Sequence, residues 1–334
     1  MDLRMSLDTN RNGPTSGQGR VGEVLILGAG PAGLSAAIYA ARANHSPLLL
    51  TGQDIGGQVA TTTLVENYPG FTDGIEGPEL ARVMQTQAEK FGARVEYDTV
   101  QSADLSKRPF RLSGESGEYR AHTLIVATGA SPVKLAVPGE RELTGRGVSY
   151  CATCDGYFFQ EKEIVVVGGG DSALEEGLFL TKFASRVTVI HRRDTLRAGS
   201  LLQKRARENP KMSFIWNAVV TKVLGTTRVE GVCTRDVKTG EERILPTSGI
   251  FIYIGHRPNT DLFVGQLDMD GRGYLVTDRW MHTNIPGVFA AGEITDPRFR
   301  QVITSAGMGA AAAIEAEKFL AEHAEETTLV NQAA

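Results

Sequence analysis

The chain has 334 residues, 41% of them hydrophobic and 22% charged, and a net charge of −4. This length and composition predict an ordinary globular protein of about two domains, each large enough for a core of its own. The slightly acidic balance argues against nucleic acid or an anionic membrane as the main partner, and no apolar run approaches the roughly 18 residues that a membrane span needs.

The first motif is a glycine-rich turn between a predicted strand and a predicted helix. The short run 23–27 is apolar after its first residue, Glu23, and Gly28-Ala29-Gly30-Pro31-Ala32-Gly33 follows. Apolar side chains then recur at helical spacing from Leu34. Glycines in this pattern let the backbone approach a pyrophosphate at the positive end of the helix, and a proline suits the first helical turn. The segment predicts a dinucleotide site.

The acid that usually binds a ribose hydroxyl about 20 residues after such a turn is missing. The strand predicted over residues 47–50 ends in Thr51-Gly52-Gln53, so ribose binding must use hydroxyls, amides or backbone groups. Next come Gly56-Gly57-Gln58, the threonines up to Thr63, and Asn67. A surface loop and a cofactor cradle explain these residues equally well.

A helix is predicted over residues 78–91, with an apolar stripe that is typical of packing. Strands are predicted near residues 94–97 and 110–112. A further apolar strand, 122–127, runs through Ala127 into Thr128-Gly129. Such an ending suits a backbone turn beside a bound cofactor, although a buried strand of any function can end in glycine.

Two of the three cysteines form the motif Cys151-Ala-Thr-Cys154, which Asp155 follows. Cysteines at this spacing can close a small disulfide that is ready to re-open, which is electron-pair chemistry. Three cysteines are too few for a disulfide framework, so we expect a redox-active pair in a reducing cytoplasm. Cys233 lies in a strand-like stretch, and we interpret it as a structural thiol.

A second strand, turn and helix begin soon after the cysteines. Residues 163–167 predict a strand, and Gly168-Gly-Gly170-Asp171-Ser172-Ala173 opens the next helix. The strand 186–190 then delivers His191-Arg192-Arg193 about 20 residues after Gly170, where the ribose-reading residue normally lies. Arginines there favour the 2′-phosphate of NADP, which guanidinium groups bind bidentately, and Arg197 could add a third cation. The alternative is a solvated basic start of a helix.

The last third of the chain again contains apolar strands that end in glycine. A strand over residues 248–254 closes on Gly255 and Pro258, where a hinge is plausible, and the buried strand 287–291 ends in Gly292-Glu293. An acid just past a strand could accept a ribityl or ribose hydroxyl, or simply cap a loop. Residues 301–307 lead into a helix predicted over 310–322.

These motifs, in this order, strongly resemble the bacterial low-molecular-weight thioredoxin reductases. The resemblance covers residues 23–320, and the segments that carry it are Gly56-Gly-Gln58 with the threonines and Glu66-Asn67-Tyr68, Cys151-Ala-Thr-Cys154-Asp-Gly156, Gly168–Ala173, His191–Asp194 and Gly287–Gly292. The combination is far more specific than any single motif, because the cysteines and the arginines must lie in this order inside one nucleotide domain.

The resemblance implies an α/β fold with two Rossmann-like nucleotide-binding domains of the three-layer ββα type. The NADPH domain is inserted into a discontinuous FAD domain. On this basis we expect an FAD domain made of residues 21–133 and 258–322, and an NADPH domain with the CxxC motif over residues 134–257. The polar ends of the chain, 1–20 and 323–334, are predicted to be flexible tails, and the first of them resembles neither a secretory signal nor an anchor.

The resemblance also assigns the candidate site residues. The FAD residues would be Gly28, Gly30, Pro31, Ala32, Gly33, Gln58, Thr63, Asn67, Ala127, Thr128, Gly129, Gly292, Glu293, Arg300, Gln301 and Val302. The NADPH residues would be Gly168, Gly170, Asp171, Ser172, Ala173, His191, Arg192, Arg193 and Arg197. Glu293 stands where the family usually has the shorter Asp.

The implied reaction passes an electron pair from NADPH through FAD and the Cys151–Cys154 disulfide to thioredoxin. Cys154 would face the flavin, Cys151 would attack the partner, and Asp155 would donate the proton as the disulfide opens. A solvated turn acid is the alternative interpretation of Asp155. Nicotinamide and dithiol cannot occupy one flavin face together, so the insert would rotate on hinges near Pro132-Val133 and His256–Pro258. The family also implies a homodimer formed through the FAD domains.

The sequence leaves three alternative functions to compare with this one. A dithiol oxidase on the same frame would pass electrons to oxygen, but it should lack the arginine clamp. A reductase of another thioredoxin-like or peroxiredoxin-linked partner is closer to the function that the resemblance implies. A zinc-bearing binding module is the poorest fit, because structural zinc usually takes four ligands and only one cysteine pair is present. No metal is expected.

Overall fold

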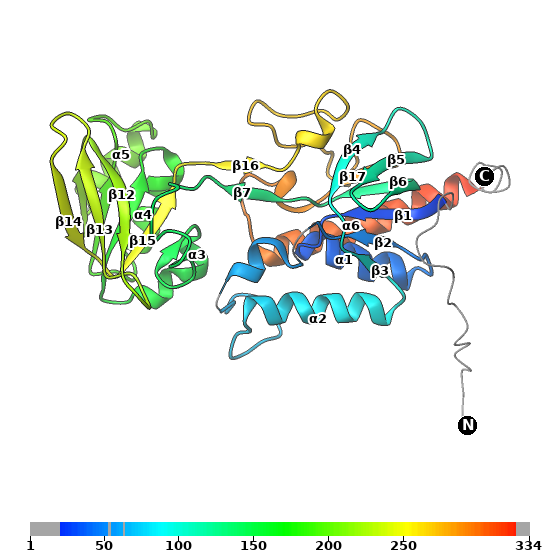
Figure 1. Ribbon diagram of the computed structural model, residues 1–334, viewed down its shortest axis with the longest axis horizontal. Helices are drawn as coiled ribbons and strands as arrows, with labels where there is room; N and C mark the ends of the chain where they lie inside the picture. Colours follow the sequence, from blue (N-terminus) through cyan, green and yellow to red (C-terminus); the bar gives the residue numbers. More distant parts are fainter. Residues whose placement is uncertain (1–20, 53–54, 63, 325–334) are drawn as a thin grey trace.

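The computed structural model describes residues 21–52, 55–62 and 64–324, so the first predicted tail, most of the second, and Thr63 lie outside the described residues. Two lobes are joined by a narrow two-stranded connection (Figure 1). The first lobe is built from both ends of the chain and the second from its middle.

The first lobe contains a seven-stranded sheet. Strands β3, β2, β1, β6 and β17 run parallel in that order, and the antiparallel strands β5 and β4 extend the other end of β6. Their bounds are β1 (Val21–Leu27), β2 (Leu48–Leu50), β3 (Arg94–Glu96), β4 (Val100–Asp104), β5 (Phe110–Gly114), β6 (Glu118–Val126) and β17 (Val288–Ala290).

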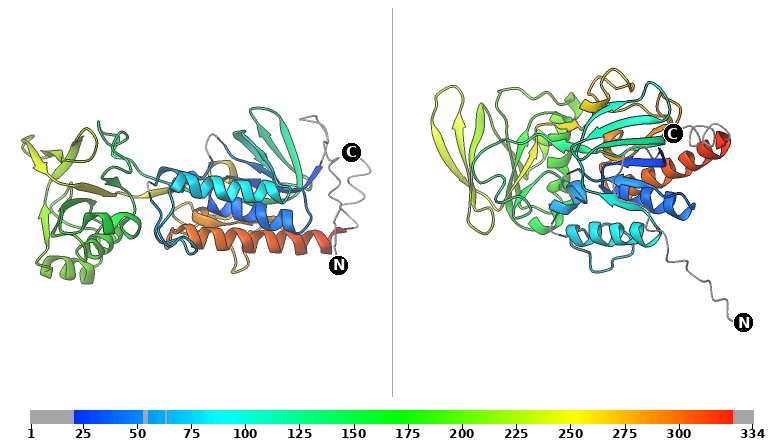
Figure 2. Two further views of the ribbon diagram at one scale, coloured as in Figure 1. Left: turned by 90° about the horizontal axis from the view of Figure 1, so that it is seen from below. Right: turned by 45° about the vertical axis from the view of Figure 1, so that its right-hand side comes forward.

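Three α-helices cover one face of this sheet and lie side by side (Figure 2). They are α1 (Pro31–Arg42), α2 (Gly77–Lys90) and α6 (Val302–Glu322), and short 3₁₀ turns occur at η1 (Gly57–Thr61), η3 (Asp261–Phe263) and η4 (Gly292–Ile294). Because side chains alternate along a strand, β1 serves two cores: Val24 and Ile26 pack against the helices, whereas Leu25 and Leu27 pack against β4, β5 and the segment after η3.

The second lobe repeats this plan. A five-stranded sheet has the order β11-β10-β9-β15-β8, and a separate three-stranded antiparallel sheet has the order β12-β13-β14. The bounds are β8 (Val148–Ser149), β9 (Glu163–Gly168), β10 (Arg186–Ile190), β11 (Met212–Ile215), β12 (Ala218–Leu224), β13 (Gly231–Asp236), β14 (Glu242–Pro246), β15 (Gly249–Tyr253), α3 (Ala152–Asp155), η2 (Gly156–Phe159), α4 (Asp171–Leu180) and α5 (Ser200–Glu208).

The same alternation divides the core of this lobe. Val166 and Val189 face α4 and α5, and Val165 and Val167 face the antiparallel sheet. Each lobe therefore has helices, a largely parallel sheet and a second β layer. The predicted α/β fold with two Rossmann-like domains of the three-layer type is confirmed.

The two chain crossings between the lobes pair with each other. Strands β7 (Ala130–Pro132) and β16 (His256–Pro258) form an antiparallel ribbon in which His256 lies opposite Pro132. In Figure 1 this ribbon spans the gap between the lobes. The domain boundaries given above, 133/134 and 257/258, stay predictions.

One predicted helix begins earlier than expected. Helix α6 starts at Val302, whereas the sequence predicted a helix only from residue 310. Gly307 and Gly309 lower helix propensity, which hid this first part. Gly309 is needed there because a Cβ would lie 1.9 Å from the carbonyl oxygen of Ala32 on α1, so the two helices touch at this point.

Within residues 21–324, apart from the gaps named above, no helix combines the length and the apolar character that a membrane span requires.

Candidate active site

The two cysteines of the CxxC motif form a disulfide at the start of α3. Cys151 is the residue that precedes the helix, and its Sγ accepts a hydrogen bond of 3.2 Å from the backbone N–H of Cys154. The backbone N–H of Cys151 donates to Oγ of Ser149 at 3.1 Å. The disulfide is thus held by its own turn and by the end of β8.

A buried carboxylate holds the residue before the disulfide. Glu140 is 2% exposed and accepts hydrogen bonds from the backbone N–H groups of Leu135 and Ala136, just after the ribbon. The hydroxyl of Tyr150 also donates to Glu140, at 2.8 Å. Glu140 therefore connects the first crossing between the lobes to the residue next to Cys151.

The disulfide faces a cavity of about 750 Å³ that both lobes enclose. The first lobe contributes the glycine turn of the first motif, η1, the end of β6 and the start of α6. The second lobe contributes residues 148–155 and three side chains of α4, Ser172, Glu175 and Glu176. A group bound by the first motif would therefore lie next to the disulfide.

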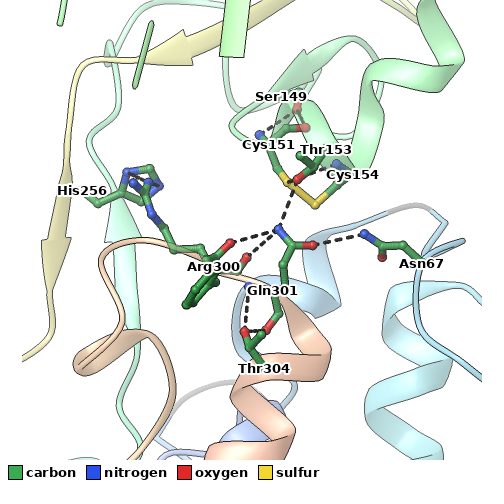
Figure 3. Close-up of a disulfide and its surroundings, with 10 residues drawn as sticks. Asn67, Ser149, Cys151, Thr153, Cys154, His256, Arg300, Gln301 and Thr304 are labelled. Atoms are coloured by element: carbon green, nitrogen blue, oxygen red, sulfur yellow. Dashed lines mark hydrogen bonds between the residues drawn. A yellow bond between two sulfur atoms is a disulfide. The ribbon is translucent and has the colours of Figure 1, made fainter. Parts of the chain in front are cut away.

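The amide of Gln301 spans the contact between the lobes (Figure 3). Its Oε1 accepts from Nδ2 of Asn67 at 3.1 Å, and its Nε2 donates to Oγ1 of Thr153 at 3.1 Å. The backbone N–H of Gln301 donates to Oγ1 of Thr304, which fixes the start of α6. Gln301 thus joins a loop of the first lobe to the CxxC turn.

Three titratable side chains of the second lobe border the cavity, and each has a raised pKa. Burial raises the pKa of the Asp155 carboxyl, against a smaller opposite effect of Ser149. Burial also raises the pKa values of Glu176 and Tyr253, and Arg300 opposes both shifts. Oε2 of Glu176 and the hydroxyl of Tyr253 are buried without a hydrogen-bond partner among the described residues. Unsatisfied polar atoms at a cavity wall indicate a place for a ligand.

Glu293 lies on the opposite wall, in η4 just after β17. Burial raises its pKa to about 7, although the charges of Arg300 and Asp296 act in opposite directions on it. A carboxyl group with this pKa can either donate or accept a hydrogen bond near neutral pH. This makes Glu293 suited to a hydroxyl-bearing ligand.

Residues 22–309 match the family of pyridine nucleotide-disulphide oxidoreductases. The chain belongs to this family. A thioredoxin reductase of Streptomyces coelicolor is 50% identical over 309 residues, which are 92% of this chain and 96% of that protein. The resemblance to bacterial thioredoxin reductases is therefore confirmed, and the protein is an oxidoreductase.

Two solved structures of the family are informative together. The thioredoxin reductase of Streptococcus pyogenes has 44% identity and a TM-score of 0.87, and covers 90% of this chain and 99% of its own. The thioredoxin reductase of Lactococcus lactis in its FR conformation has the same identity and the same coverage, but a TM-score of only 0.62. The two relatives are equally similar to this chain in sequence, but their structures superimpose on it unequally well. This difference indicates that similar domains are arranged differently in the two relatives.

The first glycine turn fits the pyrophosphate of a dinucleotide. A Cβ at Gly28 would lie 2.4 Å from the carbonyl oxygen of Ala127 and one at Gly33 would collide with Gly28, so these two glycines allow close packing of β1, α1 and β6. A Cβ on Gly30 would meet nothing within 4 Å. The start of α1 has no side-chain cap, so its backbone N–H groups are available to a phosphate.

The second turn has the same design. A Cβ on Gly168 would lie 2.5 Å from the carbonyl oxygen of Tyr253, and one on Gly170 would meet nothing within 4 Å. Helix α4 also starts without a side-chain cap. This turn fits the pyridine nucleotide that the family name requires.

The arginine-bearing loop packs on this second turn. The carbonyl oxygen of Gly169 accepts from the backbone N–H of Arg197 at 2.7 Å, and Oδ1 of Asp171 accepts from the N–H of Gly199. His191 is 5% exposed, and its Nε2 lies 3.0 Å from the carbonyl oxygen of Thr195. Asp171 and His191 thus hold the loop together, while Arg192, Arg193 and Arg197 are exposed.

The structure therefore separates the predicted site residues into two groups. The cavity brings together the three catalytic candidates, Ser172 and most FAD candidates, namely Gly28, Gly30, Pro31, Ala32, Gln58, Ala127, Thr128, Gly129, Glu293, Arg300, Gln301 and Val302. The other NADPH candidates and Gly33, Asn67 and Gly292 do not line it. Thr63 lies outside the described residues. The roles of all these residues stay predictions.

Sequence reasoning missed several cavity residues. Glu175 and Glu176 follow Ser172 at helical spacing on α4, so the i, i+3, i+4 rule would have found them. His256, Tyr253 and Thr153 offered no such signal, because their places depend on contacts between the lobes.

Proposed function

We propose that this protein is an NADPH-dependent thioredoxin reductase that holds FAD in the cavity and uses Cys151–Cys154 as its redox-active disulfide. The observation that carries the proposal is the position of this disulfide, which shares one cavity with the first glycine turn of the other lobe. Relatives about 50% identical over most of the chain support it, since they are named thioredoxin reductases.

The bound cofactors would supply the electron pair that reduces the disulfide. The residues of the chain provide the rest. The turns at Gly30 and Gly170 would bind the two pyrophosphates, and Glu293 would bind a hydroxyl of the first cofactor. The exposed guanidinium groups of Arg192, Arg193 and Arg197 would bind the 2′-phosphate of the second.

Asp155 would hold and release the proton. Its raised pKa favours the protonated carboxyl, which is the form that can protonate a thiolate when the disulfide opens. Cys151, the first cysteine of the motif, would then attack the disulfide of thioredoxin, and Cys154 would release the product by closing the internal disulfide again.

The arrangement of the lobes supports a rotation between two states. Here the disulfide lies at the cavity, whereas the arginine-bearing loop does not line it. The disulfide and a nicotinamide bound near the arginine-bearing loop could therefore reach one flavin only one after the other. The β7–β16 ribbon is the place where the insert could rotate between these two states. The unequal TM-scores of the two bacterial relatives support such a motion.

The test is an anaerobic titration of the purified protein. One equivalent of NADPH is added while the flavin absorbance is followed, and oxidised thioredoxin is added afterwards. We expect bleaching followed by recovery, with a much slower reaction for NADH. Cys151→Ser and Cys154→Ser should each bleach without recovery, whereas Cys233→Ser, the matched control, should behave as the parent protein does.

Two other outcomes would change the proposal. Bleaching without recovery in the parent protein would leave NADPH as the donor and point to another disulfide partner, such as a peroxiredoxin-linked protein. A protein that is not bleached by NADPH would contradict the proposed donor, and a dithiol oxidase would become the better hypothesis.

A further inference from the structure

A chain of polar groups leads from the first lobe to one sulfur of the disulfide (Figure 3). Nδ2 of Asn67 donates to Oε1 of Gln301 at 3.1 Å, and Nε2 of Gln301 lies 3.1 Å from Oγ1 of Thr153. Oγ1 of Thr153 in turn lies 3.3 Å from Sγ of Cys151. Three segments far apart in the sequence therefore meet at this sulfur.

The direction of these hydrogen bonds follows from their surroundings. Nε2 of Gln301 also lies 3.2 Å from the carbonyl oxygens of Phe299 and Arg300, which can only accept. The amide nitrogen, not the oxygen, must therefore face this side, and Thr153 accepts from it. A sulfur in a disulfide has no hydrogen, so the Thr153 hydroxyl must donate to Cys151 Sγ.

We infer that Thr153 is a catalytic residue of the disulfide reduction, as the hydrogen-bond donor to the sulfur that leaves, and that Gln301 positions it. The inference rests on the proposed function, which supplies the electrons. Two electrons and one proton convert the disulfide into one thiolate and one thiol. The bond between the two Sγ atoms breaks, and Cys151 Sγ keeps the bonding pair as a thiolate. Cys154 Sγ takes the supplied electron pair and the proton of Asp155, and becomes the thiol.

A hydrogen bond to a charged acceptor is stronger than one to a neutral acceptor. The Thr153 hydroxyl and the backbone N–H of Cys154 both donate to Cys151 Sγ, so both stabilise the charge that forms there. These hydrogen bonds lower the pKa of Cys151 in the reduced pair and stabilise the reduced state. Because Gln301 lies on the first lobe, Thr153 is oriented in this way when the insert faces the cavity.

The test uses the purified holoenzyme and needs neither NADPH nor thioredoxin, so its failure is distinguishable from failure of the proposed function. Thr153→Val removes the donor with little change of shape, Thr153→Ser keeps it, and Gln301→Glu replaces the amide donor by an acceptor. Thr86→Val, on the exposed face of α2, is the matched control. The pair is equilibrated anaerobically with mixtures of reduced and oxidised dithiothreitol, and the free thiols are trapped and counted by mass spectrometry.

We expect Thr153→Val to lower the equilibrium constant for reduction about fivefold, which is about 20 mV for a two-electron couple. The rate at which iodoacetamide alkylates Cys151 at pH 7 should fall by a similar factor, because the thiolate fraction falls. Gln301→Glu should have a similar effect, and the double variant should not add to it. Thr153→Ser and Thr86→Val should remain within about 1.5-fold of the parent protein.

Two results would overturn the inference. One is a Thr153→Val protein whose equilibrium constant and alkylation rate match those of the parent protein. The other is a Thr153→Ser protein that is as impaired as Thr153→Val, because the loss would then follow from packing of the methyl group and not from the hydroxyl. The pH profile of alkylation between pH 5 and 9 separates a change of pKa from a change of access.

Discussion

Nη1 of Arg300 lies 2.6 Å from Nδ1 of His256, which joins the segment before α6 to the ribbon between the lobes. A guanidinium group can only donate, so the imidazole must be neutral to accept. Burial, and after it the charge of Arg300, lowers the pKa of His256 to about 4. This contact therefore depends on pH.

The first prediction concerns acid stability. An imidazole titrates near 6.5 in the unfolded chain, so the depressed pKa of His256 contributes stability above about pH 6.5 that is lost as the pH falls towards 4. His256→Asn, which keeps an acceptor near the position of Nδ1, should lose about 1 kcal/mol less between pH 7 and pH 5. Urea unfolding at both pH values measures this. Equal losses in both proteins would contradict the prediction.

The second prediction concerns the proton donor. Asp155→Asn keeps the shape of the side chain but cannot deliver a proton, so kcat with thioredoxin should fall roughly 100-fold. In the parent protein the rate should decrease as the pH rises through the raised pKa of Asp155, because the acid form is then lost. That decrease should be absent from the variant. A variant with the parent pH profile would show that Asp155 is only a solvated turn acid.

The third prediction concerns the choice of nicotinamide cofactor. Replacing both Arg192 and Arg193 by Ala removes two exposed guanidinium groups from the loop after β10. Because one hydrogen bond to a charged group contributes about 1.5–3 kcal/mol, the KM for NADPH should rise at least about tenfold. The KM for NADH should stay within about twofold. Arg186→Ala is the control, since that exposed cation lies at the opposite end of β10.

The fourth prediction concerns Glu293 in the cofactor-free protein. Its pKa of about 7 is above the unfolded value, so stability is greatest below about pH 4.5 and is lost as the pH rises through 7. Glu293→Gln removes this cost and should be more stable than the parent protein by about 1–2 kcal/mol at pH 8, but not at pH 5. Parallel stability curves from pH 5 to 8 would refute a carboxyl group whose pKa is raised by burial.

Much of the fold was readable from the sequence because short-range patterns determine it. The apolar stretch that becomes β10 was predicted over the residues it occupies, 186–190, and both glycine turns lie between a strand and a helix as expected. The start of α6 was not predicted, because the close approach of Gly309 to Ala32 is a tertiary constraint that local propensity does not contain.

The candidate site was predictable only in part for the same reason. The cysteines and the glycines have characteristic spacings. By contrast, the hydrogen bond between Asn67 and Gln301 joins residues 234 positions apart, and no pattern along the chain indicates it. The buried oxygens of Glu176 and Tyr253, which have no hydrogen-bond partner among the described residues, depend likewise on tertiary packing.

The pairing of β7 with β16 has a consequence for the modular construction of the chain. Directly opposite residues of an antiparallel pair have Cα atoms only about 5 Å apart, so the insert leaves and re-enters the first lobe at nearly one point. Deleting the insert and bridging Pro132 to His256 with a short linker would leave the first lobe with its own sheet, both of its cores and its glycine turn intact. The second lobe is thus an insertion within one antiparallel hairpin of the first lobe. Each lobe can be treated as a separate module with a single connection point.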